Sequence, residues 1–270
     1  MAKTITNQPA VKSGQIYTVG DHVIACGDSL NNLFVKSVIG DQKIRAVVTD
    51  PPYGVAYVEN KKGMAELGAK DVKNIKGDHL QSEYEYTQFT KSWLEAVIPF
   101  LDTYNTFHIF NSSTQFLALR TAMAMCDIYF SQMLIWIKNQ PVMSRKDYLP
   151  GHELIAYGWD GKHKFERSQG KDLIFHPRPS KSKLHPTQKP IGLLRKIIPN
   201  VTNIGEIVYD GFLGSGSTAI AAHQLGRRCI GIEQDPAYVE NCLRRLEKLT
   251  GQNRELRNDH ERQWWTQHST

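Results

Sequence analysis

A strand, a glycine-rich turn, a helix and a second strand follow one another in the last third of the chain, and this run limits the possible folds most strongly. Residues 206–210 contain isoleucine, valine and tyrosine and end at an aspartate, as expected of a buried strand. The turn, 211–216, has the spacing Gly-x-x-Gly-x-Gly, and the small residues of 217–225 predict a helix. Residues 228–233 predict the next strand. Such a unit pairs its strands in parallel, so the sequence predicts an α/β sheet.

The rest of the chain alternates strands and helices in the same manner. Further strands are predicted in a hairpin over 14–28 and over 45–50, 106–110, 128–137 and 153–159. Helices are predicted over 29–40, 83–98, 189–199 and from 236, and another, capped by Ser112 or Ser113, ends near Cys126. Residues 160–188 predict no regular element. This order is typical of a doubly wound α/β sheet, which binds ligands at the carboxyl ends of its strands.

The predicted strand 45–50 stops at an unusual corner, Asp50-Pro51-Pro52-Tyr53. Proline has no N–H group, so the backbone here offers carbonyl acceptors, and an ionised Asp50 adds two acceptor oxygens. A neutral group with two N–H donors, such as the exocyclic amine of a nucleobase, matches this acceptor-only corner, and Tyr53 is able to stack on that base. The alternative is a proline-stiffened turn in which Asp50 is only a cap. The corner alone does not decide between them.

The glycine-rich turn predicts a second ligand site. It brings the amino terminus of a helix and unhindered backbone amides to the end of a strand. Glu233 ends the following strand, 23 residues after Asp210, where a carboxylate accepts hydrogen bonds from the hydroxyls of a ribose. Tight packing of strand against helix is the alternative interpretation of the glycines. The turn and the acidic strand end together favour a nucleoside cofactor.

Four motifs resemble the β class of amino DNA methyltransferases, including its phage-type members. They are the corner at Asp50, the turn that begins at Asp210, the segment His185-Pro186-Thr187-Gln188-Lys189-Pro190, and the amino-terminal lead Gly14-Gln15-Ile16-Tyr17 with Gly20-Asp21-His22 and Cys26-Gly27-Asp28-Ser29. The catalytic motif precedes the cofactor motif, which is the order of the β class. The resemblance covers residues 14–250.

This resemblance implies the fold of class I S-adenosylmethionine-dependent methyltransferases, which is Rossmann-like, with a circularly permuted motif order. The implied sheet is seven-stranded and mostly parallel, with one antiparallel strand. Catalysis is assigned to Asp50, Pro51, Pro52 and Tyr53. The implied cofactor is S-adenosyl-L-methionine, and no metal is implied. The residues assigned to the cofactor or base pocket are Asp28, Ser29, Lys189, Asp210, Gly211, Phe212, Gly214, Ser215, Gly216, Ser217, Thr218 and Glu233.

The implied reaction is transfer of a methyl group to N6 of an adenine that is flipped out of double-stranded DNA. Asp50 and the Pro51 carbonyl accept the two amine protons, which frees the nitrogen lone pair for in-line attack on the sulfonium methyl. Cytosine N4 is an amine of the same kind and is the alternative target, and a DNA-binding module without catalysis is a different alternative. RNA and protein substrates stay open. Methylation of cytosine C5 is disfavoured, because none of the four cysteines follows a proline.

Charge is concentrated in one part of the chain. Residues 138–196 carry 13 lysines and arginines but five acidic residues, whereas the whole chain has a formal net charge of +6. Aromatic residues are interleaved there, and this combination indicates a nucleic-acid surface, with solvated basic loops as the alternative. Target recognition is expected at 160–184, within a single catalytic domain of residues 14–250 between polar tails 1–13 and 251–270.

Partners and location follow from the same features. Double-stranded DNA is the expected partner, and a homodimer is common in the class. No endonuclease motif is visible, so the sequence identifies no restriction partner. The chain contains neither an apolar signal core nor a run of 18 apolar residues, and its cysteines are scattered. We therefore expect no membrane insertion and a reducing cytoplasm, in a bacterial or phage-infected cell.

Overall fold

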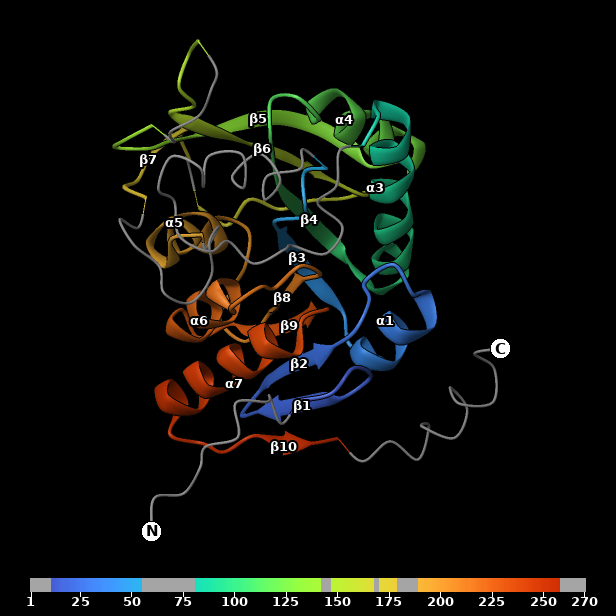
Figure 1. The fold of residues 1–270 in the computed structure, drawn as a ribbon, viewed down its shortest axis with the longest axis vertical. Coiled ribbons are helices and arrows are strands. Elements are labelled where there is room, and N and C mark those ends of the chain that lie inside the picture. The colour runs from blue at the N-terminus through green and yellow to red at the C-terminus, as the bar shows by residue number, and fades with distance from the viewer. Residues whose placement is uncertain (1–10, 55–80, 142–146, 168–169, 179–188, 258–270) are drawn as a thin grey trace, which may run out of the picture.

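The computed structural model describes residues 11–54, 81–141, 147–167, 170–178 and 189–257 (Figure 1). Most of both predicted tails, including Trp264 and Trp265, lies outside the described residues, and so do residues 185–188 of the third motif. None of the described helices is long and apolar enough to cross a membrane.

The described residues contain ten β-strands and six α-helices. The strands are β1 (Ile16–Val19), β2 (His22–Cys26), β3 (Ile44–Thr49), β4 (Leu101–Asn111), β5 (Tyr129–Ile137), β6 (His152–Trp159), β7 (Leu173–Phe175), β8 (Ile207–Asp210), β9 (Arg228–Glu233) and β10 (Glu255–Leu256). The helices are α1 (Asn32–Ile39), α3 (Glu83–Val97), α4 (Phe116–Met125), α5 (Ile191–Ile197), α6 (Ser217–Gln224) and α7 (Pro236–Thr250). Two 3-10 turns, η1 (Ile98–Phe100) and η2 (Ile198–Asn200), follow α3 and α5.

The ten described strands form one sheet in the order β10-β1-β2-β9-β8-β3-β4-β6-β5-β7. From β2 to β4 the neighbouring strands are parallel, β6 is antiparallel to β4, and β5 is antiparallel to β6. The seven strands from β2 to β5 therefore have the implied pattern, with β6 as the antiparallel strand. Short strands are added on both sides of these seven, β1 and β10 next to β2 and β7 next to β5. The implied count of seven is therefore too low for the whole sheet. The doubly wound fold class is confirmed.

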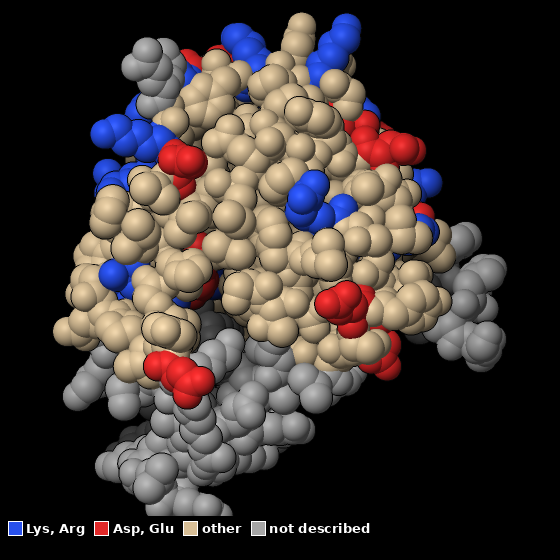
Figure 2. Space-filling model, turned by 90° about the horizontal axis from the view of Figure 1, so that it is seen from above, with Lys and Arg blue, Asp and Glu red and all other residues tan. Residues whose placement is uncertain are grey.

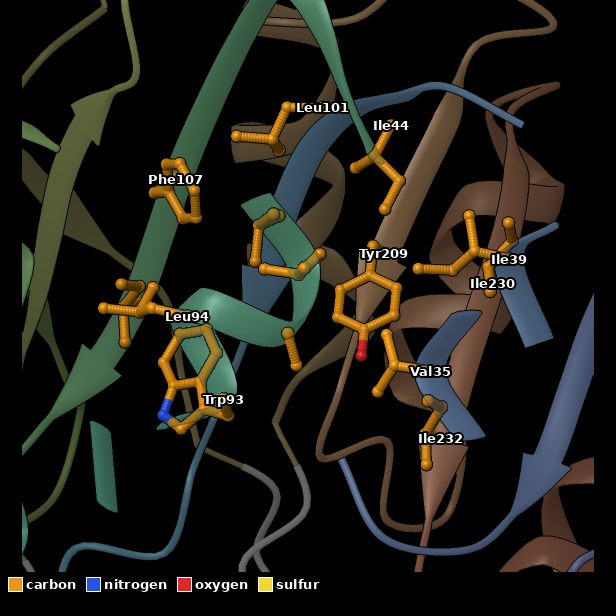
Figure 3. Close-up of a cluster of buried hydrophobic side chains, with 14 of the residues drawn as sticks. Val35, Ile39, Ile44, Trp93, Leu94, Leu101, Phe107, Tyr209, Ile230 and Ile232 are labelled. Atoms are coloured by element: carbon orange, nitrogen blue, oxygen red, sulfur yellow. The ribbon is translucent and has the colours of Figure 1, made fainter. Parts of the chain in front are cut away.

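Helices cover both faces of the sheet, with α1, α3 and α4 on one face and α5, α6 and α7 on the other (Figure 1). Along β3, Val47 packs against the first layer, whereas Ala46 and Val48 pack against the second. A parallel strand that is buried on both faces reads as a continuous apolar run, which is why this strand was predictable. Figure 3 shows the first layer, where Trp93 of α3 and Val35 of α1 contribute to the core against the sheet.

Most helix boundaries follow their sequence signals, and α7 is the clearest case. The Asp235 side chain accepts a hydrogen bond from the Ala237 amide, and Pro236 occupies the first helical position. The helix ends at Gly251, which adopts a left-handed conformation with φ of 72°.

The start of α4 differs from the prediction. A cap at Ser112 or Ser113 is wrong, because the helix begins at Phe116 with Gln115 at the N-cap and no side-chain cap bond. Ser112 Oγ instead accepts a hydrogen bond from the Gln115 amide, one turn before the helix. At the end of β4 the Asn111 side chain accepts a hydrogen bond from the Ser112 amide, so Ser112 belongs to the turn between β4 and α4.

Candidate active site

The predicted motifs come together at the carboxyl ends of neighbouring strands. Asp50 follows β3, Asp210 is the last residue of β8, Glu233 is the last residue of β9, and Asp28 and Ser29 come soon after β2. These strands lie in the order β2-β9-β8-β3, so their ends form one continuous edge of the sheet. This is the edge at which doubly wound sheets bind ligands.

Asp210 joins the catalytic corner to the glycine-rich turn. Its Oδ1 accepts hydrogen bonds from Thr49 Oγ1 at 2.7 Å and from the Phe212 amide at 3.1 Å. Its Oδ2 accepts a hydrogen bond from Thr218 Oγ1 at 2.6 Å, and burial raises the pKa of Asp210 to about 6. The carboxylate therefore fixes the turn against the end of β3. Thr49, which sequence analysis did not select, is the residue that makes this link.

The glycines of the turn allow close approach of the backbone. Gly216 is the N-cap of α6 with φ of 87°, and a Cβ at this position would lie 2.3 Å from Cys242 Sγ. Ser29 Oγ donates a hydrogen bond to the Gly211 carbonyl, which connects the end of β2 to the turn. Ser217 Oγ, in the first turn of α6, is buried and has no hydrogen-bond partner among the described atoms. An unpaired hydroxyl at a helix amino terminus suits a polar ligand group.

Glu233 presents a carboxylate beside this turn. Its Oε2 accepts a hydrogen bond from the Gly214 amide and its Oε1 accepts one from the Asp235 amide, each at 2.8 Å. Each oxygen keeps a lone pair for a ligand hydroxyl. Burial raises the pKa of Glu233 to about 7, although both hydrogen bonds oppose that increase. The exposed Asp28 lies close by, since its Oδ1 accepts from Gln234 Nε2 at 2.8 Å.

Two other residues of the turn contact the protein and hold the turn in place. The ring of Phe212 lies 5.8 Å from that of Phe89 and 5.7 Å from that of Trp93, which attaches the turn to α3. The Ser215 carbonyl accepts a hydrogen bond from the Arg245 guanidinium of α7. The turn is thus held from both layers of helices.

These contacts make the edge between β2 and β8 suitable for a nucleoside cofactor. The helix terminus and the unpaired Ser217 hydroxyl suit an acidic or polar tail, and Glu233 suits a ribose diol. Within the described ranges, no group of three or more His, Cys, Asp or Glu side chains is arranged to bind a metal ion.

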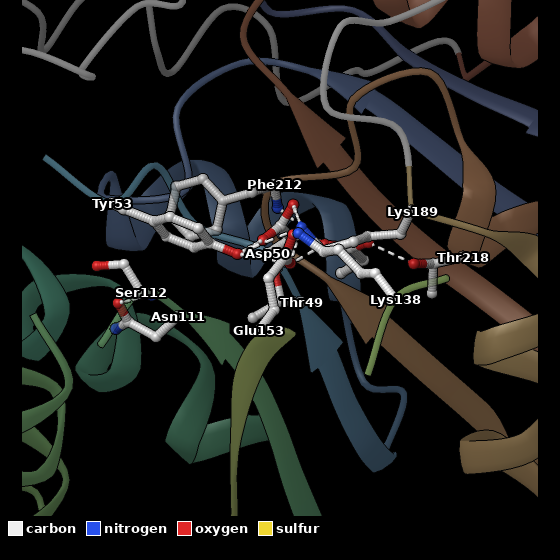
Figure 4. Close-up of polar contacts among 11 residues, drawn as sticks. Thr49, Asp50, Tyr53, Asn111, Ser112, Lys138, Glu153, Lys189, Phe212 and Thr218 are labelled. Atoms are coloured by element: carbon white, nitrogen blue, oxygen red, sulfur yellow. Dashed lines mark hydrogen bonds and ion pairs between the residues drawn. The ribbon is translucent and has the colours of Figure 1, made fainter. Parts of the chain in front are cut away.

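Asp50 lies in a network of charged and polar side chains (Figure 4). Its Oδ1 accepts a hydrogen bond from the Tyr53 hydroxyl at 2.7 Å, and its Oδ2 pairs with the ammonium group of Lys189. The Asp50 side chain is 22% exposed, so a substrate is able to reach it. Pro51 is buried and Pro52 is half-buried. Lys189, which the sequence placed in the cofactor or base pocket, lies at the catalytic corner.

Two charged residues that sequence analysis did not select complete this network. Glu153, near the start of β6, pairs through Oε2 with Lys189 at 3.0 Å and through Oε1 with Lys138 at 2.7 Å. The Tyr53 hydroxyl is 3.3 Å from Glu153 Oε2. The available signal was a glutamate beside the apolar run of β6, because a charge is rarely buried without a partner.

The electrostatics of the network follow from burial and from the two lysines. Burial raises the pKa of Asp50, and the charge of Lys189 opposes that increase. Burial acts on Glu153 in the same direction, but the charges of Lys189 and Lys138 outweigh it and lower its pKa. Burial would lower the pKa of Lys189, but Asp50 and Glu153 raise it. Two carboxylates therefore face two ammonium groups, and their formal charges cancel.

The described parts of the predicted recognition region, residues 160–167 and 170–178, reach opposite ends of the strands, and residues 168–169 and 179–184 lie outside the described residues. Residues 160–167 lie at the start of β3, where Arg45 pairs with Glu166 at 2.9 Å. At 3.3 Å per residue, the length of β3 separates that pair from the catalytic corner by roughly 16 Å. β7 is parallel to β5, so both strands end on the same side of the sheet as Asp50. The Arg178 amide, which follows β7, donates a hydrogen bond to Asn139 Oδ1 at 3.0 Å. The part around Arg178 therefore lies at the same end of the sheet as the corner, with β4, β6 and β5 between β7 and β3.

The surface at the end of the molecule that carries α4 and β5 has few charged side chains. Its described surface is mainly uncharged, with scattered side chains of both signs (Figure 2). Its exposed large apolar side chains are Leu117, Met125, Tyr129 and Met133. In the described residues, this face lacks the continuous basic surface that nucleic-acid binding requires.

Comparison with known proteins links this geometry to DNA modification. A family model described as DNA methylase matches residues 44–244. The type II methyltransferase M2.DpnII of Streptococcus pneumoniae is 27% identical over 222 residues, which cover 74% of this chain and 81% of that protein. The type II methyltransferase M.HinfI of Haemophilus influenzae is 25% identical over 255 residues, covering 84% of this chain and 69% of that protein.

Solved structures share the fold at lower identity. A complex of M1.HpyAVI with SAM superposes with a TM-score of 0.60 and 24% identity, covering 82% of this chain and 98% of that one. The cytosine-N4-specific PvuII DNA methyltransferase superposes with a TM-score of 0.68 and 19% identity, covering 90% of this chain and 94% of that one.

Proposed function

This chain belongs to the DNA methylase family, and on that premise we propose that it methylates N6 of adenine at specific sites in double-stranded DNA. The cofactor is S-adenosylmethionine, as in the M1.HpyAVI complex. The observation that carries the proposal is the hydrogen bond from Thr49 to Asp210, which joins the acceptor corner at Asp50 to the cofactor turn. M2.DpnII and M.HinfI are both called type II methyltransferases, and a restriction–modification setting is part of the proposal.

The corner at Asp50 is suited to a neutral amine. We assign the Asp50 carboxylate and the Pro51 carbonyl to the two N–H groups of the target base, because neither offers a donor that would repel them. Hydrogen bonds to both protons draw the nitrogen toward tetrahedral geometry and expose its lone pair. No strong base is needed, since the methylated amine is acidic until it loses a proton. The proline carbonyl and the carboxylate position the nitrogen and stabilise the positive charge that develops on it.

The cofactor edge would hold the methyl donor next to that corner. S-adenosylmethionine supplies an activated methyl group when it is bound. Glu233 would accept from the ribose hydroxyls, the amino terminus of α6 with Ser217 would hold the carboxylate of the methionine tail, and Asp210 keeps the turn fixed against β3. Lys189 and Tyr53 contact the carboxylate of Asp50 in the corner. The Tyr53 hydroxyl is bonded to Asp50, which holds the tyrosine ring beside the acceptor corner.

DNA approaches the same edge from outside. A base stacked in a duplex does not reach Asp50, so the base is flipped out of the helix, which costs a few kcal/mol. We assign contact with the duplex to the described residues that follow β5 and to the chain around Arg178, because both lie at the same end of the sheet as the corner. Residues 160–167 are assigned a structural role at the opposite edge.

A transfer assay tests the function. The wild-type protein is expected to move tritiated methyl groups from S-adenosylmethionine to unmethylated genomic DNA. Asp50→Ala removes the acceptor and is expected to lower the rate at least about 100-fold while cofactor affinity by calorimetry is unchanged. Asp102→Ala is the matched control, because Asp102 lies at the start of β4, away from the strand ends that form the site. This variant is expected to keep the wild-type rate. Near wild-type transfer by the Asp50 variant contradicts the mechanism.

Cytosine N4 is the second candidate target. Its exocyclic amine has the same two N–H donors, so the corner at Asp50 receives it equally well. Aspartate at the first position of the corner favours adenine through the family resemblance. Identification of the methylated nucleoside separates the two.

A further inference from the structure

The acceptor oxygens of Asp50 are already occupied in this structure. Oδ1 accepts from the Tyr53 hydroxyl, and Oδ2 pairs with the Lys189 ammonium, whose side chain is only 9% exposed. Both partners are donors, as the amine of a target base is. Lys189 therefore holds the place at Asp50 that the proposed reaction gives to the substrate amine.

Lys189 cannot stay there during the reaction. The attacking nitrogen becomes positively charged as it takes the methyl group, and an ammonium group bonded to the same carboxylate would repel that charge. Moving a lone ammonium into an apolar surrounding would also be unfavourable. A withdrawn Lys189 thus needs a second anionic partner within reach.

Glu153 is such a partner. Its Oε2 already lies 3.0 Å from Lys189 Nζ, while its Oε1 is held by Lys138 at 2.7 Å. Figure 4 shows Glu153, Lys138 and Lys189 grouped around Asp50. An ammonium group has three donors, so rotation near the end of the Lys189 side chain exchanges Asp50 for Glu153 without a change in the backbone.

We propose that Lys189 is a placeholder that moves from Asp50 to Glu153 when the target amine enters, and that Glu153 is the positioning residue which makes this exchange possible. The inference rests on the proposed methyl transfer. Lys138 binds Glu153 Oε1 and so orients the other oxygen, Oε2, toward Lys189. In the resting state the same contacts satisfy Asp50 and favour its ionised form against the effect of burial.

Glu153→Gln tests the exchange, because the amide keeps the shape but not the charge. Lys189 then has Asp50 as its one anionic partner among the described residues, and it competes with the substrate amine. The single-turnover rate with unmethylated genomic DNA and tritiated S-adenosylmethionine is expected to fall about tenfold or more. The KM for the cofactor stays unchanged. Glu153→Asp, which keeps the charge, is expected to recover part of the rate.

A second background separates this role from simple support of the fold. In a Lys189→Met protein there is no ammonium to withdraw, so Glu153→Gln is expected to change the rate less than about twofold, or to raise it by removing a carboxylate near Asp50. Loss of Lys189 also raises the pKa of Asp50, so rates are compared on the alkaline plateau of each variant.

Glu240→Gln is the matched control. Glu240 is also a buried carboxylate with two cationic partners, Arg244 and Arg254, but it lies on α7. This variant is expected to keep the wild-type transfer rate.

If Glu153→Gln, or Glu153→Asp, lowers the single-turnover rate equally in the wild-type and the Lys189→Met proteins, Glu153 acts independently of Lys189. That result would overturn this inference but not the proposed function. A wild-type protein that transfers no methyl group to DNA overturns the proposed function, and the inference with it.

Discussion

Four carboxylates lie along one edge of the sheet, and their surroundings give them different tasks. Among the described residues, Asp210 and Glu233 contact hydroxyls and backbone amides but no cationic side chain, and burial raises their pKa values to about 6 and about 7. Asp50 and Glu153 share the ammonium of Lys189. The first pair therefore suits neutral donors of a cofactor, and the second pair keeps an ionised acceptor ready for an amine.

The raised pKa of Glu233 predicts that cofactor binding depends on pH. Ribose hydroxyls donate to the ionised carboxylate, so binding favours the charged form and lowers its pKa. Below pH 7 the free protein must lose a proton to bind, and the affinity for S-adenosylmethionine is expected to fall by up to about tenfold per pH unit. Calorimetry across this range, in buffers of different ionisation enthalpy, measures both the affinity and the proton released.

Glu233→Gln supplies the control for that experiment. The amide does not titrate, so its affinity is expected to be weaker at pH 8 but nearly constant down to pH 6. A wild-type affinity that is constant over the same range contradicts the assignment of Glu233 to the ribose.

At the level of elements, the turn between β8 and α6 depends on glycine for geometric reasons. Gly216 has φ of 87°, and a Cβ there meets Cys242 Sγ at 2.3 Å, whereas Gly251 has φ of 72° with nothing within 4 Å of its Cβ position. Both positions disfavour a side chain because of the backbone, but Gly216 also lacks space.

Substitution of these two glycines separates the effect of backbone strain from the effect of a steric clash with Cys242. Gly251→Ala is expected to lower the free energy of unfolding by about 1 kcal/mol, and Gly216→Ala by about 2–4 kcal/mol. Only Gly216→Ala is expected to weaken cofactor binding. Urea denaturation and calorimetric titration measure the two effects, and equal losses of stability would mean that the collision is relieved at no cost.

The elements were predictable where their signals are local. The apolar runs of β3 and β9 and the proline start of α7 specify those elements directly. The edge strands β7 and β10, of three and two residues, are too short to show a period.

The residues of the site were likewise predictable where the sequence signal is local. Asp50 and Glu233 stand at strand ends that the sequence marks. Lys138 follows one predicted strand and Glu153 begins another, but their contact depends on the pairing of β5 with β6, and Lys189 reaches Asp50 across 139 positions of sequence. Such long-range pairings have no local signal.

At the level of the whole molecule, two arginines of the basic segment lie at opposite ends of the strands, and the proposed DNA site includes one of them. Arg178 lies beside the β5–β6 hairpin at the catalytic edge, whereas Arg167 follows Glu166, which pairs with Arg45 at the opposite edge. Charge density along the sequence does not distinguish these two arginines, but the fold does.

Arg178→Ala and Arg167→Ala form a matched pair for this distinction. If Arg178 contacts a phosphate, its loss weakens DNA binding and reduces the slope of log K against log salt by about 1. Arg167→Ala is expected to leave both quantities unchanged. Fluorescence anisotropy of a labelled duplex over a range of salt concentrations measures them, and the reverse result would move the DNA to the other edge of the sheet.

The most direct measurement is the identity of the methylated nucleoside. Unmethylated genomic DNA is incubated with the protein and S-adenosylmethionine, digested to nucleosides and analysed by mass spectrometry. The account predicts N6-methyladenine as the product, and none with the Asp50→Ala protein. N4-methylcytosine in its place, or no methylated nucleoside at all, would contradict it.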